Sequence, residues 1–473
     1  MYTVTMAIPS CLRVGIFVTI MVLCARGQGP AEDEVRHLPG LSVQPTFKQY
    51  SGFLYAGGNR RLHYWYMESQ RHPETDPLLL WLNGGPGASS LIGAMAENGP
   101  FRVGKKGKGL LINPHSWNTV ANVLYLEAPA GVGFSYDPSG VYDTNDDKTA
   151  DDNYLAIQAF FRKFPTLRKK EFYITGESYG GVYVPMLTQR LLKAPKGINL
   201  RGFVVGNGAL DETALDNSLV FFGYHHGFFD LDTWTRLIQH CCNESASPQG
   251  CNFLDPKTET GALCKEEAEK VYEKMASLPL NPYNIYDECR TDNILLETTA
   301  RIMSRTSPYH RHLYAAARNR SYSKPLASDC IDLNDVAAYM NRPDVKAALH
   351  VESSPLNWTS SSYILQYHRQ YYDMTPAVKE LVDSGRLRSL IYNGDVDMVC
   401  NFIGDQWFVN NLGYKNTTEY KEWFHKKQLA GFYQSFAGNL TYATIRGSGH
   451  MVPHDKPAQA LHMISRFMAN KPL

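Results

Sequence analysis

The chain has 473 residues, enough for one large domain with insertions or for two or three ordinary domains. Lys and Arg (47) nearly balance Asp and Glu (46), so no overall basic field is available to bind nucleic acid. With 44% hydrophobic and 20% charged residues, the composition is that of a globular protein and argues against disorder over most of the length.

The N-terminus carries an apolar run, Val14 to Cys24, which follows Arg13. The run suits the core of a signal peptide and is too short to span a bilayer, although a signal anchor is the alternative. We predict a signal peptide over residues 1–27, entry into the secretory pathway and no membrane span in the mature protein. Five N-x-[ST] glycosylation acceptors agree with this route: Asn243, Asn319, Asn357, Asn416 and Asn439.

From residue 75 to 210, short apolar runs alternate with amphipathic stretches. This alternation is typical of an open, largely parallel sheet covered by helices. An amphipathic helix is expected over residues 149–164. Buried strands are expected at residues 77–82, 123–126, 171–175 and 202–205.

Near residue 211 the pattern becomes helical, cysteine-rich and interrupted, which indicates an inserted cap over 211–330. Within it, residues 264–278 predict an amphipathic helix, whereas 291–324 is basic and shows no sustained periodicity. The core pattern then resumes, so we expect an α/β fold whose core consists of 28–210 and 331–473. Later strands are predicted at 387–392 and 440–445, and a closing helix at 457–468.

Seven cysteines follow the predicted signal peptide, so six can pair and one is left over. Cys400 stands apart from the others, between two strand-like segments, and is expected to be free. Zinc binding by the remaining cluster is the rival interpretation, but no two-residue Cys spacing or nearby His pair supports it. We therefore expect disulfides, no metal and no organic cofactor.

The sequence Gly176-Glu177-Ser178-Tyr179-Gly180 follows a predicted strand directly and precedes a helix-compatible segment. In this G-x-S-x-G setting the glycines permit a cramped strand-to-helix turn that exposes the serine hydroxyl above the sheet. The pattern predicts Ser178 as a nucleophile, which needs a base and an acid that orients the base.

Enzymes with this turn have Ser, then Asp or Glu, then His along the chain, each just past a strand. Asp397 and His450 satisfy both conditions, and Asp395 competes for the acid role. Negative charge that develops on the attacked carbonyl needs backbone N–H donors. We expect one from Tyr179 and the other from Gly85, in the glycine-rich loop that follows the strand at 77–82.

Several of these segments occur together in a known family. The chain resembles the serine carboxypeptidase family from about residue 38 to the C-terminus. The resemblance rests on residues 81–87 (WLNGGPG), 97–101 (ENGPF), 127–136, 176–181, 393–397 (NGDVD) and 449–453 (GHMVP).

This resemblance implies an α/β-hydrolase fold with an inserted, largely helical, disulfide-containing cap. It assigns the triad to Ser178, Asp397 and His450, with Asp397 preferred over Asp395. It also places the oxyanion hole at Gly85 and Tyr179.

The resemblance further implies a group that holds the substrate's terminal carboxylate: Asn83, Gly84 and Glu177, with Glu97 as the partner of Glu177. Two carboxyls in contact share a proton at mildly acidic pH, so a protonated Glu177 could donate to that carboxylate. Tyr283 and Met451 are expected near the substrate pocket.

The implied disulfides are Cys241–Cys264, Cys242–Cys251 and Cys289–Cys330. The family usually has cysteine where Ala88 stands, bonded to a partner near the position of Ser361, and both cysteines are missing here. The loop at Ala88 is therefore expected to be looser. Relatives are cut as zymogens in the cap, and residues 291–325 offer trypsin-like sites at Arg301, Arg305, Arg311, Arg318 and Arg320.

The expected function is a serine-type carboxypeptidase that releases C-terminal, preferably hydrophobic, residues from peptides at acidic pH through an acyl-enzyme on Ser178. Its partners would be peptides with a free C-terminus. An acyltransferase or esterase of the same fold is the enzymatic alternative. The resemblance also raises a non-catalytic role as a stabilising partner of lysosomal glycosidases such as beta-galactosidase and neuraminidase. We further expect a homodimer that is lysosomal or secreted.

Overall fold

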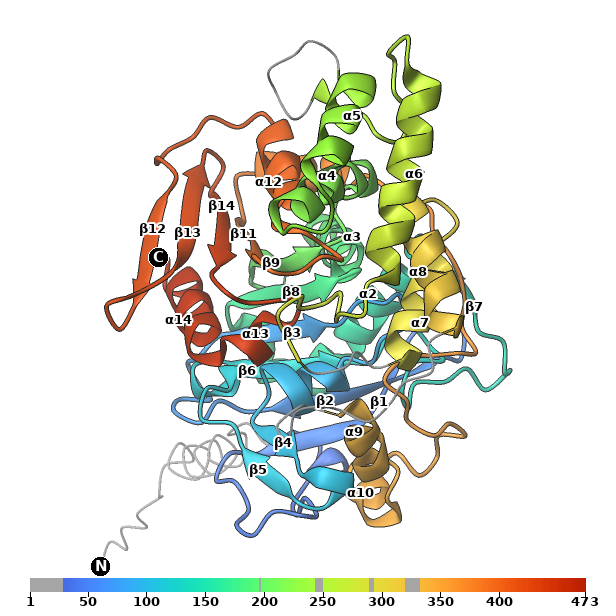
Figure 1. The fold of residues 1–473 in the computed structure, drawn as a ribbon. Coiled ribbons are helices and arrows are strands. Elements are labelled where there is room, and N and C mark those ends of the chain that lie inside the picture. Colours follow the sequence, from blue (N-terminus) through green and yellow to red (C-terminus); the bar gives the residue numbers. More distant parts are fainter. Residues whose placement is uncertain (1–28, 195–196, 243–249, 289–292, 320–331) are drawn as a thin grey trace, which may run out of the picture.

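The computed structural model describes residues 29–194, 197–242, 250–288, 293–319 and 332–473. The predicted signal peptide therefore lies outside the described residues. One ten-stranded sheet forms the centre, in the order β1-β2-β6-β3-β8-β9-β11-β14-β13-β12 (Figure 1). Its strands are β1 (Gln49–Tyr55), β2 (Arg61–Met67), β3 (Leu78–Leu82), β6 (Asn122–Leu126), β8 (Phe172–Ser178), β9 (Leu200–Gly208), β11 (Arg388–Gly394), β12 (Lys421–His425), β13 (Gln428–Phe436) and β14 (Leu440–Ile445).

The middle of the sheet, from β6 to β14, is parallel, and antiparallel pairs flank it at both edges. Both faces of a parallel sheet are covered, so its strands are buried along most of their length. In β3, for example, all five residues are buried. Two two-stranded ladders lie outside it: β4 (Phe101–Val103) with β5 (Leu110–Ile112), and β7 (Asp143–Asn145) with β10 (Gln366–His368).

Alternate residues of the strands enter two separate cores. Leu80 packs in a core with α2 (Asp146–Lys163), α3 (Gly180–Lys193) and α11 (Thr375–Asp383), and Phe408 of α12 (Phe402–Asn411) joins it. Leu79 and Trp81 face the other core, which contains residues of six further helical segments. These are η2 (Gly93–Glu97), η4 (Trp117–Thr119), α9 (Leu333–Met340), α10 (Pro343–Ala348), α13 (Val452–Asp455) and α14 (Pro457–Met468).

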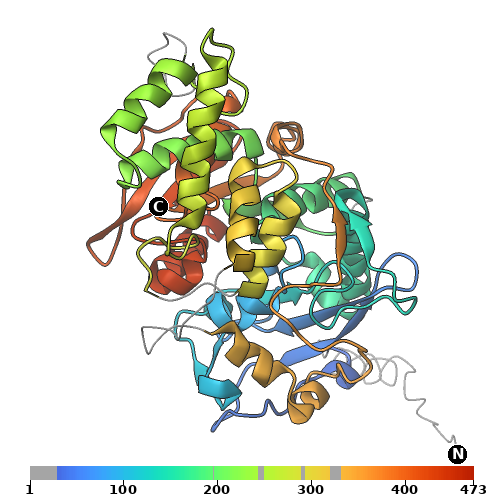
Figure 2. The same ribbon diagram turned by 45° about the vertical axis from the view of Figure 1, so that its right-hand side comes forward.

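Among the described residues, five helices that follow β9, α4 to α8, surround a third core. Figures 1 and 2 show them gathered beside the sheet, which agrees with the expected helical cap. Two disulfides are present here, Cys241–Cys264 and Cys242–Cys251, and Cys400 is buried and free. The expected Cys289–Cys330 bond lies outside the described residues. The helices are α4 (Glu212–His225), α5 (Leu231–Cys241), α6 (Gly261–Ser277), α7 (Asn293–Met303) and α8 (Pro308–Asn319).

We expected no sustained helical periodicity over residues 291–324. This expectation is wrong over most of that range, because α7 and α8 are regular helices. The turn at Ser304–Thr306 changes the phase of the apolar pattern, so no single period covers both helices. Leu296 in α7 and Leu313 in α8 are buried, whereas Arg311 is exposed.

Among the glycosylation acceptors, Asn357, Asn416 and Asn439 are exposed. Asn243 and the side chain of Asn319 lie outside the described residues. Within the part of the chain that the structure describes, no helix has both the length and the apolar composition that crossing a bilayer would need.

Candidate active site

Ser178 lies at the sharp turn between β8 and α3. Its φ is 62°, a left-handed conformation that is costly for any residue with a Cβ. Neighbouring glycines make room for this turn. A Cβ at Gly176 would stand 2.5 Å from the carbonyl oxygen of Leu82, and one at Gly181 would stand 2.7 Å from the backbone nitrogen of Ala209. The turn therefore has the strained geometry that presents a nucleophile.

Asp397 and His450 follow β11 and β14, which pair in parallel, so both lie at the same edge of the sheet. The Nδ1 atom of His450 lies 2.7 Å from Oδ2 of Asp397. Asp395, the competing acid, instead accepts a hydrogen bond from the backbone N–H of Gly447 at 2.6 Å. The geometry therefore favours Asp397 as the acid that orients the His450 ring.

Asp397 is completely buried and accepts further hydrogen bonds. The backbone N–H of Val399 donates to Oδ1 at 2.9 Å, and that of Cys400 donates to Oδ2 at 3.2 Å. The Asn207 amide also donates to Oδ2, at 2.9 Å. Sequence reasoning missed Asn207, although the signal was present in an amide between two glycines at the end of a predicted strand.

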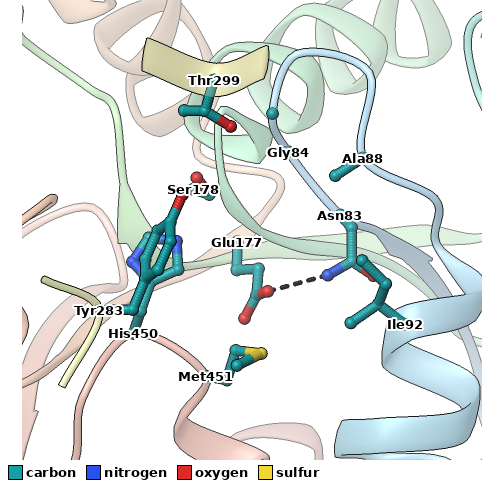
Figure 3. Close-up of a pocket in the computed structure, with 11 residues that line it drawn as sticks. Asn83, Gly84, Ala88, Ile92, Glu177, Ser178, Tyr283, Thr299, His450 and Met451 are labelled. Carbon is teal, nitrogen blue, oxygen red and sulfur yellow. Dashed lines mark hydrogen bonds between the residues drawn. The ribbon is translucent and has the colours of Figure 1, made fainter. Parts of the chain in front are cut away.

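Ser178 and His450 line one pocket, together with Tyr283. Figure 3 shows Ser178 beside the Tyr283 and His450 rings, whose centroids are 4.9 Å apart. The backbone N–H of His450 donates to the Tyr283 carbonyl at 2.7 Å, which ties the loop after β14 to the segment that follows α6. The pocket consists of Asn83, Gly84, Gly85, Ala88, Ile92, Glu177, Ser178, Tyr283, Thr299, His450 and Met451, and we call it the carboxylate pocket.

The glycine-rich loop after β3 lies against the serine turn. A Cβ at Gly84 would stand 2.3 Å from the Tyr179 nitrogen and 2.7 Å from the Ser178 Cβ, so only glycine fits. Gly85 has φ 103°, which also requires glycine. The backbone of Gly85 and that of Tyr179 thus lie on two adjoining segments beside Ser178.

Glu97 and Glu177 meet in the carboxylate pocket through Asn83. The Asn83 amide donates to Oε1 of Glu97 at 2.9 Å and to Oε1 of Glu177 at 2.8 Å, and Figure 3 shows the second bond. Trp81 Nε1–H donates to the Asn83 oxygen at 2.8 Å, which fixes the orientation of the amide. The second oxygen of each glutamate is buried with no partner outside the pair, and a hydrogen bond between the two carboxyls contributes to the pKa of each.

This burial sets the charge of the pair. Removal from water raises the pKa of Glu97 and, most strongly, that of Glu177, where the nearby Glu97 charge raises it further. Two carboxyls in one buried site cannot both ionise cheaply, so the pair retains a proton in mildly acidic solution.

Cys400 lies behind the triad. Burial raises the pKa of its thiol well above the usual value, and the charges of Asp397 and Asp405 raise it further. The thiol is therefore not activated as a nucleophile. Potential ligand atoms of Asp397, Cys400 and His450 lie within 4.8 Å of one another, but the bonds described above already engage Asp397 and His450.

Ala88 and Ser361 are directly opposite each other in an antiparallel bridge. The flanking hydrogen bonds, Ser89 N–H to the Ser360 carbonyl and Ser362 N–H to the Gly87 carbonyl, are both 2.9 Å long. Ala88 is also buried, so the structure shows backbone hydrogen bonds and packing at the loop that was expected to be looser.

The sheet order, the turn at Ser178 and the positions of the acid and the base after β11 and β14 define an α/β-hydrolase. The model of the serine carboxypeptidase family matches residues 39–470. The chain therefore belongs to the serine carboxypeptidase family and is a serine-type carboxypeptidase.

Three known proteins illustrate the similarity. The lysosomal protective protein of Mus musculus is 40% identical, over 94% of this chain and 95% of the relative. Serine carboxypeptidase ctsa-4.1 of Caenorhabditis elegans is 38% identical, over 96% of this chain and 97% of the relative. The solved structure of a prohormone-processing carboxypeptidase from Saccharomyces cerevisiae shares the fold, with a TM-score of 0.70 at 22% identity, over 94% and 97% of the two chains.

Proposed function

We propose that this carboxypeptidase forms an acyl-enzyme on Ser178, with His450 as general base and Asp397 as the acid that orients it. The observation that carries the proposal is the 2.7 Å contact between His450 and Asp397 in the same site as the strained Ser178. Buried acid, oriented imidazole and exposed hydroxyl are the three parts that this chemistry needs.

In the first step the Ser178 oxygen attacks the carbonyl carbon of the last peptide bond, and its proton passes to Nε2 of His450. The N–H groups of Gly85 and Tyr179 stabilise the negative oxygen that forms. His450 then gives the proton to the departing amine, which leaves as the free C-terminal residue. Water then attacks the acyl carbon while His450 removes its proton. The bond to Ser178 breaks, His450 returns the proton to the serine oxygen, and the acyl group leaves as a shortened peptide.

The terminal carboxylate of the peptide binds at Asn83, Gly84 and the Glu97–Glu177 pair. A protonated glutamate donates a hydrogen bond to it, and a fully ionised pair repels it. The raised pKa of both glutamates supports recognition at acidic pH. Tyr283, Met451 and Ile92 give the same pocket apolar walls, which favours a hydrophobic C-terminal residue.

The carboxylate pair also bears on the enzymatic alternative. An acyltransferase or esterase has no need of a buried site for a free carboxylate, so Asn83 and Glu177 favour peptides. The two disulfides support passage of the protein through the oxidising secretory pathway, from which it would reach lysosomes or be secreted. Association with glycosidases, a homodimer and cleavage within 291–325 stay predictions.

The decisive assay measures release of the C-terminal residue from an N-blocked hydrophobic dipeptide between about pH 4 and pH 8. We expect activity that is highest at acidic pH and is abolished in Ser178→Ala. Hydrolysis that persists in folded Ser178→Ala would contradict the acyl-enzyme. Activity on the dipeptide amide that equals activity on the free acid at every pH would contradict the carboxylate site.

A further inference from the structure

The side chain of Tyr179 is anchored at the end far from the backbone. Tyr179 directly precedes α3 and is 1% exposed. Its hydroxyl donates to Oδ1 of Asp146 at 2.7 Å, and Asp146 is the first residue of α2 and is completely buried. The phenol therefore ties the start of α3 to the start of α2, two helices that pack against each other.

Asp146 is itself held in place, because three further donors reach it. Its Oδ1 also accepts the hydroxyl of Tyr367 at 2.7 Å. Its Oδ2 accepts the backbone N–H groups of Gln370 and Tyr371, at 2.6 and 3.0 Å. Each oxygen thus has two donors, and the carboxyl cannot turn without breaking buried hydrogen bonds. Burial raises the pKa of both phenols well above the usual value, so each keeps the proton that it donates.

The ring of Tyr179 is confined from the sides as well. The rings of Tyr183 and Tyr367 meet it edge-on, with centroids 5.2 and 5.7 Å away. The Arg369 guanidinium lies 5.5 Å from its centroid and forms an ion pair with Glu212 at 3.1 Å. Edge-on aromatic pairs and a guanidinium over a ring are favourable contacts. The ring of Tyr179 is therefore fixed together with its hydroxyl.

This anchoring bears on the backbone of Tyr179. The preceding residue, Ser178, has φ 62°, and a strained conformation persists only where its surroundings hold it. On the proposed function, the N–H of Tyr179 points at the oxygen of the attacked carbonyl, and such a donor depends on accurate placement. A shift of about 1 Å in a group of this kind can cost about 100-fold in rate.

We propose that Asp146 is a positioning residue of the oxyanion hole, which holds the Tyr179 N–H toward the attacked carbonyl through the Tyr179 phenol. Asp146 lines neither the carboxylate pocket nor a second cavity beside Ser178, so it acts through Tyr179 and not on the substrate. The inference rests on the proposed function, in which that N–H stabilises the negative oxygen.

The phenols of Tyr179 and Tyr367 give a matched pair of variants. Both donate to the same oxygen of Asp146 at the same distance, but only Tyr179 carries an oxyanion donor of the proposed function. With an N-blocked hydrophobic dipeptide near pH 5, we expect Tyr179→Phe to lower kcat about tenfold, with KM within about twofold. Tyr367→Phe should keep the kcat of the unmodified enzyme. Both variants are assayed below their Tm, so that each is folded.

Tyr179→Phe keeps the aromatic ring, which matters for substrate binding. Tyr179 also lines the second cavity beside Ser178, together with residues that include Asp216, Thr299 and His310. Because the ring stays, this lining keeps its apolar surface. A fall in kcat without a change in KM then points to an interaction made only in the transition state.

A second readout measures the oxyanion hole directly. N-blocked phenylalaninal forms a tetrahedral adduct: its carbonyl carbon bonds to the Ser178 oxygen, the serine proton passes to His450, and the carbonyl oxygen takes the negative charge. N-blocked phenylalaninol has a similar shape and forms no adduct. We expect the ratio of the two inhibition constants, alcohol over aldehyde, to fall about tenfold in Tyr179→Phe and to stay unchanged in Tyr367→Phe.

An unchanged kcat in Tyr179→Phe would overturn the inference. So would an equal fall of kcat in both variants, because the loss would then follow from a disturbed fold around Asp146. A lower kcat in Tyr179→Phe with an unchanged alcohol/aldehyde ratio has the same meaning. Failure of the proposed function would look different, since the unmodified enzyme would then neither hydrolyse the dipeptide nor bind the aldehyde better than the alcohol.

Discussion

At the scale of single residues, the site depends on two kinds of buried carboxyl group. Asp397 accepts hydrogen bonds from the backbone N–H groups of Val399 and Cys400 and from the side-chain amide of Asn207. Its Oδ2 also lies 2.7 Å from Nδ1 of His450. Glu177 faces another carboxyl and an amide in a dry site, which disfavours charge. One site thus holds a carboxyl surrounded by hydrogen-bond donors and a carboxyl that shares its surroundings with a second carboxyl.

The Glu177→Gln variant tests the role of the shared proton. As pH rises through the raised pKa of the Glu97–Glu177 pair, a second negative charge develops on the pair and repels the substrate carboxylate. The kcat/KM for peptides with a free C-terminal carboxylate should therefore fall, and the kcat/KM for peptide amides should fall less. In Glu177→Gln the second charge cannot form, and we expect a flatter pH profile. The control is Glu273→Gln, the same change at an exposed glutamate. A pH profile of kcat/KM that stays as steep in Glu177→Gln as in the unmodified enzyme would refute the mechanism.

The Asn207→Asp variant tests the support of Asp397. It keeps the oxygen that accepts the Gly394 N–H at 3.1 Å, but it places a second carboxyl where the amide donor contacted Asp397. Repulsion between the two should disturb the orientation of His450. We expect kcat to fall by about tenfold or more with a smaller change in KM, and a shifted pH profile. Wild-type kcat in this variant would show that Asn207 only shapes the backbone.

At the scale of elements, the loop after β3 is fastened to residues 360–362 by the bridge between Ala88 and Ser361. Hydrogen bonds on both sides of the bridge mark these two residues as a non-hydrogen-bonded pair, in which opposed Cα atoms are about 4.5 Å apart. This spacing lies within the range for a disulfide.

The Ala88→Cys/Ser361→Cys double variant should therefore form a disulfide without movement of the chain. The hydroxyl of Thr298 would lose its bond to Ser361, a smaller effect than the new crosslink. We expect about 2–4 kcal/mol of added stability against unfolding, seen as a higher Tm that returns to the level of the reduced protein after reduction. The single variant Ala88→Cys is the control, and free thiols in the oxidised double variant would count against the geometry.

At the scale of the whole molecule, buried acids that lack charge partners make stability depend on pH. Burial raises the pKa of Asp405 from 3.8 to about 8, and one of its oxygens has no partner. The unfolded chain loses this proton near pH 4, whereas the folded chain keeps it until about pH 8. The folded state therefore binds more protons in this window, and this group's contribution to stability declines as pH rises. His310, with a lowered pKa, acts in the opposite direction.

The Asp405→Asn variant isolates this contribution, because an amide does not titrate. It retains an oxygen for Asn393 and for the Gly208 N–H. The Tm of the variant minus that of the unmodified protein should increase from pH 5 to pH 8. A difference that stays constant between these two pH values would mean that Asp405 is charged in the folded protein.

The sequence by itself determined the elements whose patterns are local. The apolar runs at β3 and β14, the helix α14, the turn at Ser178 and the order of the triad all follow from residue types and spacing. The first two strands, which lie before the alternating region, were not predicted, because their buried residues include the polar Gln49, Ser51 and His63. The regular helices α7 and α8 were not predicted, because the turn at Ser304–Thr306 interrupts their period.

Only the tertiary structure decided what depends on contact between distant segments. It showed the 2.7 Å contact between Asp397 and His450, which the family resemblance had only implied, and it added Asn207, which is 190 residues from Asp397. It also brought Asp216, Thr299 and His310 to one cavity. Local sequence specifies backbone conformation and hydrophobic pattern. Hydrogen-bond partners and pKa shifts depend on which side chains the folded chain encloses away from water, so they become defined only when the sheet and the cap pack together.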